Sequence, residues 1–69
     1  MSIKESDIVA LLKSLPEHHL VEGTIGTVVH VYDHNNYEVE FADLKGQTYA
    51  MLTLTAQDIL LLWYEPEMV

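Results

Sequence analysis

The sequence predicts a small, mainly β domain, and three observations support this prediction. Residues 37–41 (Tyr-Glu-Val-Glu-Phe) alternate strictly between apolar and acidic side chains, which is typical of a strand with one buried and one wet face. Turn-forming residues lie on both sides of that segment, at 33–36 and 43–47. The flanking segments are rich in β-branched and aromatic residues, which favour strands. A chain of 69 residues holds one domain, 1–69.

Two antiparallel hairpins are predicted in the middle of the chain. Residues 26–32 form the first strand, and the turn that follows contains two asparagines, which tolerate positive φ. Residues 37–41 form the return strand. A second turn around Gly46, which is free to adopt a left-handed conformation, leads to a strand over 48–54.

The C-terminal part is predicted to hold one helical turn and a last strand. Thr55 is a suitable N-cap for a single turn over residues 55–58. Residues 59–64 are all apolar or aromatic and predict a buried final strand. The polar, proline-containing residues 65–69 are expected to form a frayed tail.

The N-terminal segment fits two different elements. Four apolar residues have the i, i+3, i+4, i+7 spacing of an amphipathic helix, namely Ile8, Leu11, Leu12 and Leu15. This spacing predicts an α+β domain with a helix over residues 3–14. The apolar run within residues 7–12 fits a buried strand equally well. Pro16 ends either element, because the residue before a proline is pushed toward extended geometry.

The charge balance excludes some partners and favours others. Three lysines and no arginine face eleven acidic residues, for a net charge of −8. Nucleic-acid binding depends on Lys and Arg neutralising phosphates, so we expect no nucleic-acid partner. Anionic membrane surfaces are disfavoured for the same reason. A basic protein partner is electrostatically favourable, because complementary charge speeds encounter.

Composition also bounds the chemistry and the compartment. The chain has no cysteine, which removes disulfides, thiolate catalysis and Cys-containing zinc sites. The run 59–64 is far too short to span a bilayer. The first five residues do not resemble the start of a signal peptide. We therefore expect a soluble, cytoplasmic protein that does not associate with membranes.

Two sequence blocks resemble a known family. They are Gly26-Thr27-Val28-Val29 and Tyr37-Glu38-Val39-Glu40-Phe41, and their spacing is more specific than either block alone. The chain resembles, over residues 7 to 63, the short bacterial proteins of domain of unknown function 4926. That family carries no established activity, so the resemblance implies a bacterial source but supplies no catalytic residues.

The order of elements is also similar to small five-stranded, antiparallel SH3-like barrels. That resemblance implies a strand at 7–12, a long loop at 13–24, three strands within 25–54, one helical turn at 55–58 and a last strand at 59–63. It favours a strand over a helix at the N-terminus. The expected core consists of the following residues: Ile8, Ala10, Leu20, Val29, Val31, Val39, Phe41, Ala50, Leu52, Leu54 and Ile59.

No pattern of catalytic or metal-binding residues stands out. The histidines at 18, 19, 30 and 34 lack the spacing of known metal motifs, and we expect them to be exposed rather than ligands. Glu38 and Glu40 lie on one strand face, about 7 Å apart by strand rise. Acid–base work by such a pair needs a substrate pocket, for which so small a barrel has little room. We expect no catalytic residues, no metal, no cofactor and no enzymatic activity.

Excess apolar residues point instead to an interaction surface. The last strand does not alternate, and further bulky residues lie opposite the expected core; the set is Tyr49, Met51, Leu60, Leu62, Trp63 and Tyr64. Such a surface needs cover from loop 13–24, from a second copy or from another protein. Glu38 and Glu40 form a possible acidic contact face. The sequence predicts a non-catalytic interaction module, for example an immunity or antitoxin-like protein that binds a basic partner. The alternative is an accessory or regulatory domain that binds a small molecule or a metal ion.

Overall fold

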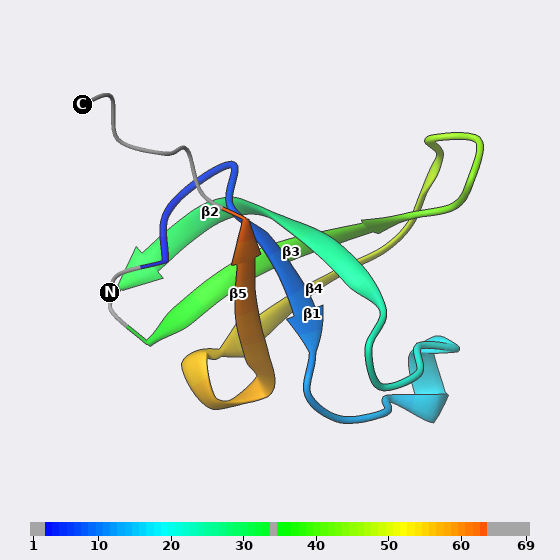
Figure 1. Cartoon of the computed structure of the whole chain (residues 1–69), viewed down its shortest axis with the longest axis horizontal. Coiled ribbons are helices and arrows are strands. Elements are labelled where there is room, and N and C mark those ends of the chain that lie inside the picture. Colours follow the sequence, from blue (N-terminus) through cyan, green and yellow to red (C-terminus); the bar gives the residue numbers. More distant parts are fainter. Residues whose placement is uncertain (1–2, 34, 64–69) are drawn as a thin grey trace.

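Five strands and two short 3-10 turns make up the fold (Figure 1). The computed structural model describes residues 3–33 and 35–63, without the side chain of Trp63. The elements in order are β1 (Ile8–Leu11), η1 (Pro16–His18), β2 (Ile25–Asp33), β3 (Asn36–Ala42), β4 (Thr48–Thr55), η2 (Ala56–Asp58) and β5 (Ile59–Trp63). Among the described residues, no helix has the length and apolar character needed to cross a membrane. The expected tail at 65–69 lies outside the described residues.

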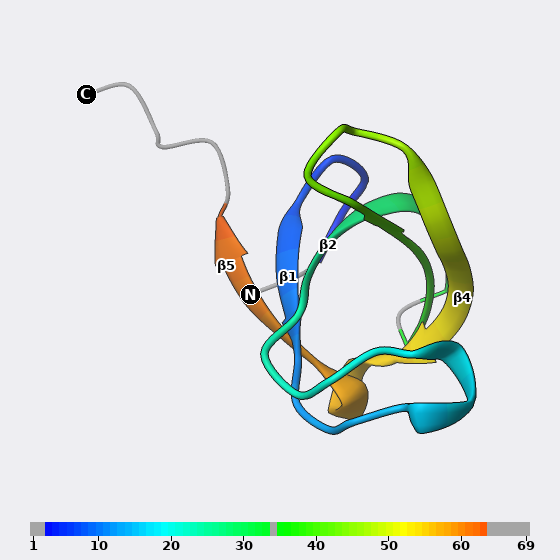
Figure 2. The same ribbon diagram turned by 90° about the vertical axis from the view of Figure 1, so that its right-hand side faces the viewer.

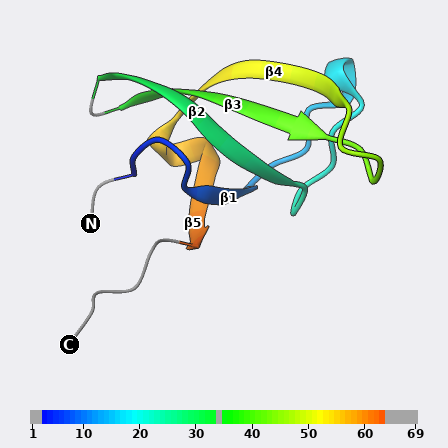
Figure 3. The ribbon, with the colours of Figure 1, turned by 90° about the horizontal axis from the view of Figure 1, so that it is seen from above.

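The strands form one antiparallel sheet in the order β4-β3-β2-β1-β5. Figure 2 shows this sheet bending round on itself, and Figure 3 shows β5 crossing the direction of β2 and β3. The sheet does not close, because β4 and β5 are its two edge strands. The prediction of a mainly β, five-stranded antiparallel fold is confirmed, as a strongly bent open sheet rather than a sealed barrel.

The N-terminal segment is a strand, Ile8–Leu11, which confirms the strand predicted within residues 7–12; the alternative of a helix over residues 3–14 is wrong. β1 lies between β2 and β5 and pairs with both. A central strand is flanked by backbone on both sides, and its neighbours shelter its side chains on both faces. Val9 and Leu11 point into the core, while Ala10 is buried on the other face. The helical spacing of the leucines is therefore coincidental.

Both predicted hairpins are confirmed. Residues 26–32 pair with 37–41 and the latter with 48–54. Beside the first turn, the Asp33 carboxylate accepts the backbone N–H of Asn35. In the second turn, the carboxylate of Asp43 accepts backbone N–H groups from Lys45 and Gln47, and Gly46 has a positive φ of 81°.

The predicted turn after β4 is confirmed as well, with Thr55 as its N-cap. The Asp58 carboxylate accepts the Thr55 backbone N–H at 2.9 Å and its hydroxyl at 3.1 Å. The first of these contacts and the Asp58 backbone N–H, which is directed at the Thr55 side chain, make a capping box, which satisfies donors that a helix start leaves open. η2 leads directly into β5 and so fixes where the last strand begins.

Most of the expected core is confirmed, with two shifts in strand face. Six expected residues are buried: Ala10, Leu20, Val39, Phe41, Leu54 and Ile59. Three more pack against the core while partly buried: Val31, Ala50 and Leu52. Ile8 is only partly buried, and Val9 and Leu11 occupy the core in its place.

Val29 was also expected in the core, and that expectation is wrong. Its side chain is 38% exposed, while Val28 is 1% exposed. The reason is a bulge: Val28 pairs with Val39 and His30 pairs with Glu38, which leaves Val29 as the extra residue. An extra residue resets the alternation of a strand. Val28 and Val31 therefore face the core together.

The centre of the core depends on close contact between Phe41 and the backbone of β2. Phe41 is completely buried. A Cβ atom at Gly26 would lie 2.7 Å from Cε1 of the Phe41 ring and 2.7 Å from Cγ1 of Val39. Real Cβ atoms do not approach other heavy atoms so closely, so the ring packs where only glycine leaves space.

We expect Gly26→Ala to destabilise the domain by about 1–3 kcal/mol through overpacking. Phe41→Ala should cost about 3–5 kcal/mol, which approaches the whole stability of a domain this small. Urea unfolding measures both. In a Phe41→Leu background, the smaller side chain should relieve the clash, so Gly26→Ala should cost less than it does in the wild type. Strictly additive costs would show that the ring does not occupy the space next to Gly26.

Candidate functional site

The outer face of the sheet, opposite the core, presents a continuous row of side chains across the first four strands. Directly paired residues lie on the same face of a sheet. Met51 pairs with Glu40, Glu40 with Thr27, and Thr27 with Ile8. The row continues at the backbone of Trp63 in β5. We call this surface the outer face.

The part of the outer face over β1, β5 and the start of β2 is apolar. Ile25, Ala10 and Leu60 stand side by side across these three strands. Ile25 and Leu60 are half exposed, at 50% and 51%, and they shelter Ala10 between them. Leu12, just after β1, is also half exposed. The domain thus leaves large aliphatic side chains open to solvent in one region.

Four of the predicted interface residues are half exposed. Tyr49 and Met51 lie on β4, and Leu60 and Leu62 on β5, with exposures between 46% and 51%. Loop 13–24 therefore leaves this side of β5 uncovered. β4 and β5 are opposite edges of the sheet, so the structure places the two pairs at the two ends of the outer face. The Trp63 side chain and Tyr64 lie outside the described residues.

The part of the outer face over β3 is acidic. Glu38 Oε1 accepts the hydroxyl of Thr53 at 2.8 Å and that of Tyr32 at 3.1 Å. Glu40 accepts the hydroxyl of Thr48. Among the described residues, no lysine forms an ion pair with either glutamate. Both predicted acidic residues therefore lie on the outer face, held by hydroxyl groups and without a neutralising cation.

The negative charge of Glu38 also affects its neighbours. The hydrogen bond that Tyr32 donates to Glu38 is the main reason why the pKa of Tyr32 lies above its ordinary value of 10.0. The ring of Tyr32 contacts His30 edge-on, with centroids 4.7 Å apart. The imidazole Nδ1 of His30 lies 3.7 Å from a carboxylate oxygen of Glu5. Aromatic rings and carboxylates thus adjoin each other along the end of β2.

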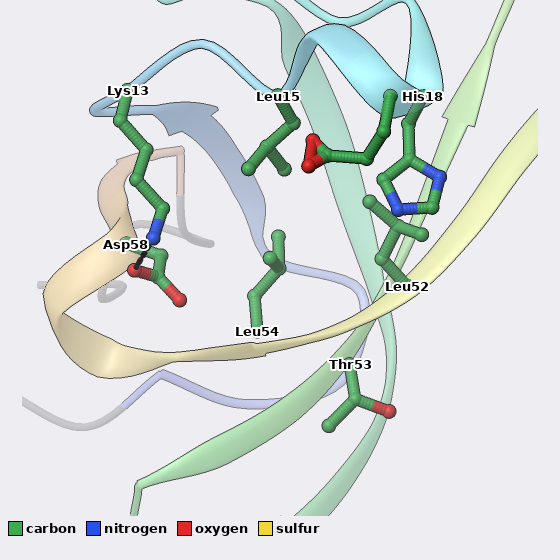
Figure 4. Close-up of a pocket in the computed structure, with 8 residues that line it drawn as sticks. Lys13, Leu15, His18, Leu52, Thr53, Leu54 and Asp58 are labelled. Atoms are coloured by element: carbon green, nitrogen blue, oxygen red, sulfur yellow. Dashed lines mark ion pairs between the residues drawn. The ribbon is translucent and has the colours of Figure 1, made fainter.

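A pocket of about 270 Å³ opens at another place, between the first loop and β4 (Figure 4). Leu15, Leu52 and Leu54 provide its apolar walls. The ion pair between Lys13 and Asp58 lies at one end, with Nζ and Oδ1 3.1 Å apart. The remaining lining residues are Glu17, His18 and Thr53. Sequence analysis foresaw neither this pocket nor the meeting of these polar groups.

The loop that forms one wall of the pocket is held by local hydrogen bonds. Leu15 and Leu20 exchange backbone hydrogen bonds of 2.8 and 3.2 Å. Pro16 starts η1, and His19 closes it in a left-handed conformation, with its N–H bonded to the Pro16 carbonyl. The hydroxyl of Ser14 accepts the backbone N–H of Glu22 at 2.9 Å. The wall is therefore defined before any ligand binds.

The family of the chain follows from comparison with known proteins. Residues 5–61 match the family model described as Domain of unknown function (DUF4926). The chain belongs to this family. No curated protein and no solved structure matches it. The resemblance noted over residues 7 to 63 is thus confirmed over nearly the same span.

The histidines of this DUF4926 domain do not gather into a metal site where they are described. No three histidine or acidic side chains among residues 3–33 and 35–63 lie close enough together to hold an ion. His18 lines the pocket, His19 caps η1 and His30 lies on β2. His34 is outside the described residues.

Two features of the DUF4926 domain escaped sequence reasoning. The apolar outer face includes Leu12 and Ile25, which the periodicity of the chain does not distinguish from core residues. The pocket joins loop residues 13–18 to residues 52–58, and nothing local links segments so far apart in the chain. The pairing of β1 with β5 brings residues 13–18 close to residues 52–58. A prediction of this strand pairing would have indicated the pocket.

The Asp58 carboxyl is expected to stabilise the fold in a pH-dependent way. The backbone N–H of Thr55 is the main cause that holds the pKa of Asp58 below its ordinary value of 3.8, and Lys13 adds to it, against the opposing effect of burial. A carboxyl with a lowered pKa stabilises fully above its unfolded pKa, and this is lost as the pH falls through the folded pKa. NMR titration of Asp58 should therefore give a midpoint below 3.8.

The Lys13→Met variant separates the causes of this shift. Because the Thr55 backbone contact is the larger cause, the Asp58 pKa should rise in this variant and still remain below 3.8. Asp58→Asn should remove the corresponding pH dependence of unfolding. An Asp58 midpoint at or above 3.8 in the wild type would contradict the capping geometry.

Proposed function

We propose that this domain is a non-catalytic protein-interaction module that binds a basic protein partner through its outer face. The observation that carries the proposal is the division of that face. Exposed aliphatic residues over β1 and β5 lie on the same face as carboxylates over β3, with β2 between them. These carboxylates have no cationic partner among the described residues. An immunity or antitoxin-like role, in which a small acidic protein masks a basic one, fits this division.

The apolar half supplies a reason to bind. Burial of apolar surface is the main favourable term in protein association. Exposed apolar patches on a small monomer mark interaction sites. Ile25, Leu60 and Leu62 are each about half exposed on β2 and β5, the two strands that flank β1. β5 is also an edge strand, and an apolar edge strand left open promotes aggregation. A partner that covers this half buries the exposed apolar side chains and also protects the open edge of β5.

The acidic half of the outer face is the reason for proposing a positively charged partner. Glu38 and Glu40 are fixed by hydroxyl groups of neighbouring strands, so little side-chain freedom is lost when a cation meets them. The net charge of the whole chain is −8, which attracts positively charged proteins over long distances at low salt. Lysines or arginines on the partner complement this half.

The accessory-domain alternative rests on a different feature. A domain that holds a small molecule would use the pocket beside β4, which has an apolar wall and several polar groups around it. Its volume of about 270 Å³ lies just below the roughly 300–1,000 Å³ of pockets for drug-sized ligands. The pocket therefore has room for a small molecule below drug size or for one protein side chain.

Capture of partners from a lysate of the source organism tests the proposal. The tagged domain should recover one positively charged protein in equal molar amount. Leu60→Ser and the double variant Glu38→Gln/Glu40→Gln should each lower recovery by roughly tenfold, the equivalent of about 1.4 kcal/mol. Leu44→Ser is the matched control, because Leu44 is fully exposed in the β3–β4 turn. Glu22→Gln is the control for lost charge.

Two outcomes would contradict the proposal. One is recovery that is the same with the outer-face variants as with the wild type, while all variants melt cooperatively. The other is self-association of the isolated domain. Sedimentation over a concentration series should give a monomer. A dimer that is lost in Leu60→Ser would assign the outer face to a second copy of the chain. Such a dimer should strengthen with added salt, because screening weakens the repulsion between acidic chains.

A further inference from the structure

The pocket beside β4 touches three consecutive residues of that strand, Leu52, Thr53 and Leu54. Successive side chains of a strand point to opposite faces. Figure 4 shows Leu52 and Leu54 directed toward the pocket and Thr53 directed away from it, so the pocket lies along the face of β4 that carries the two leucines. β4 is also an edge strand: β3 occupies one of its edges, and in the described sheet β4 has no second neighbour.

Open backbone groups and a pocket on one edge strand form a known kind of peptide-binding site. Extended peptides add to an exposed sheet edge, where main-chain hydrogen bonds give affinity and pockets for alternate side chains give specificity. From the edge strand β4, every second residue directs its N–H and C=O groups away from β3.

The size and walls of the pocket indicate what enters it. At about 270 Å³ it accommodates one large side chain with part of its backbone. Leu15, Leu52 and Leu54 make its walls apolar. The opposite wall is a loop with its own hydrogen bonds, and Asp58 is held by the capping box. Preformed walls lower the entropic cost of binding.

The charge at the pocket indicates what lies next to that side chain. Lys13 and Asp58 neutralise each other at one end. Glu17 lines the pocket and is exposed. It has no hydrogen-bond or ion-pair partner among the described residues. The pocket therefore carries one uncompensated negative charge, within a domain of net charge −8.

We infer that an extended segment of a basic protein partner adds along the free edge of β4, places an apolar side chain between Leu15 and Leu54, and sets a lysine or arginine beside Glu17. The inference rests on the proposed function and adds to it. β4 also carries Tyr49 and Met51 on the outer face. One partner is therefore able to contact the outer face and the β4 edge together.

The test uses the full chain and a display library of random short peptides. Enriched peptides should share an apolar residue close to a lysine or arginine. Glu17→Lys should weaken a selected peptide by roughly tenfold. Glu22→Lys makes the same charge change in the same loop outside the pocket, and it should leave the affinity nearly unchanged. On binding, amide hydrogen exchange should slow at alternate residues of β4.

Several results would overturn the inference. They are a library with no enriched peptide, peptide affinity that is unchanged by Glu17→Lys, slowed amide exchange on β5 in place of β4, and displacement of the peptide by the polyamine spermidine alone, which would make the pocket an amine site.

Partner capture distinguishes failure of the inference from failure of the proposed function. If Leu60→Ser abolishes capture and Glu17→Lys does not, the outer face stands and the peptide site falls. If Leu60→Ser has no effect on capture, the proposed function fails. The peptide site is then tested separately, by whether amide hydrogen exchange of β4 slows when the selected peptide binds.

Discussion

The packing of one aromatic ring against one glycine organises this domain. Phe41 on β3 is fully buried, and it fits because Gly26 on β2 has no Cβ atom. Gly26 also pairs with Val9 on β1, so the same residue lies where three strands meet. In a chain this short, few large side chains are available to fill the interior. The ring therefore fixes how closely β2 and β3 approach and where β1 lies beside them.

A core of this size covers only one face of the sheet. Bulges add to what remains exposed on the other face. Four large residues occupy the extra position where strand register shifts: Val29, Tyr32, Tyr49 and Leu62. All four are exposed by 38% or more. Bulges turn side chains away from the regular alternation, and in this domain bulky side chains at these positions are exposed to solvent among the described residues.

Charged and apolar side chains occupy different parts of the outer face. The acidic residues keep copies of the chain apart by repulsion at low salt. The exposed aliphatic side chains lie mainly over β1 and β5, while Glu38 and Glu40 lie over β3. A neutral or acidic protein gains little from such a surface. In the function proposed above, a basic protein gains from both halves, with charge complementarity as the source of specificity and apolar burial as the source of affinity.

The sequence by itself determined the features that depend on near neighbours. Alternation at 37–41 predicted a half-buried strand, and Thr55 predicted the start of η2, because a strand face and a helix cap are set by residues a few positions apart. Tertiary structure decided the rest. The strand at Ile8–Leu11, the exposure of Val29 and the pocket beside β4 depend on which distant strands pair and in what register. A register shift of one residue reverses the face of every side chain beyond it, and no local pattern in the sequence records such a shift.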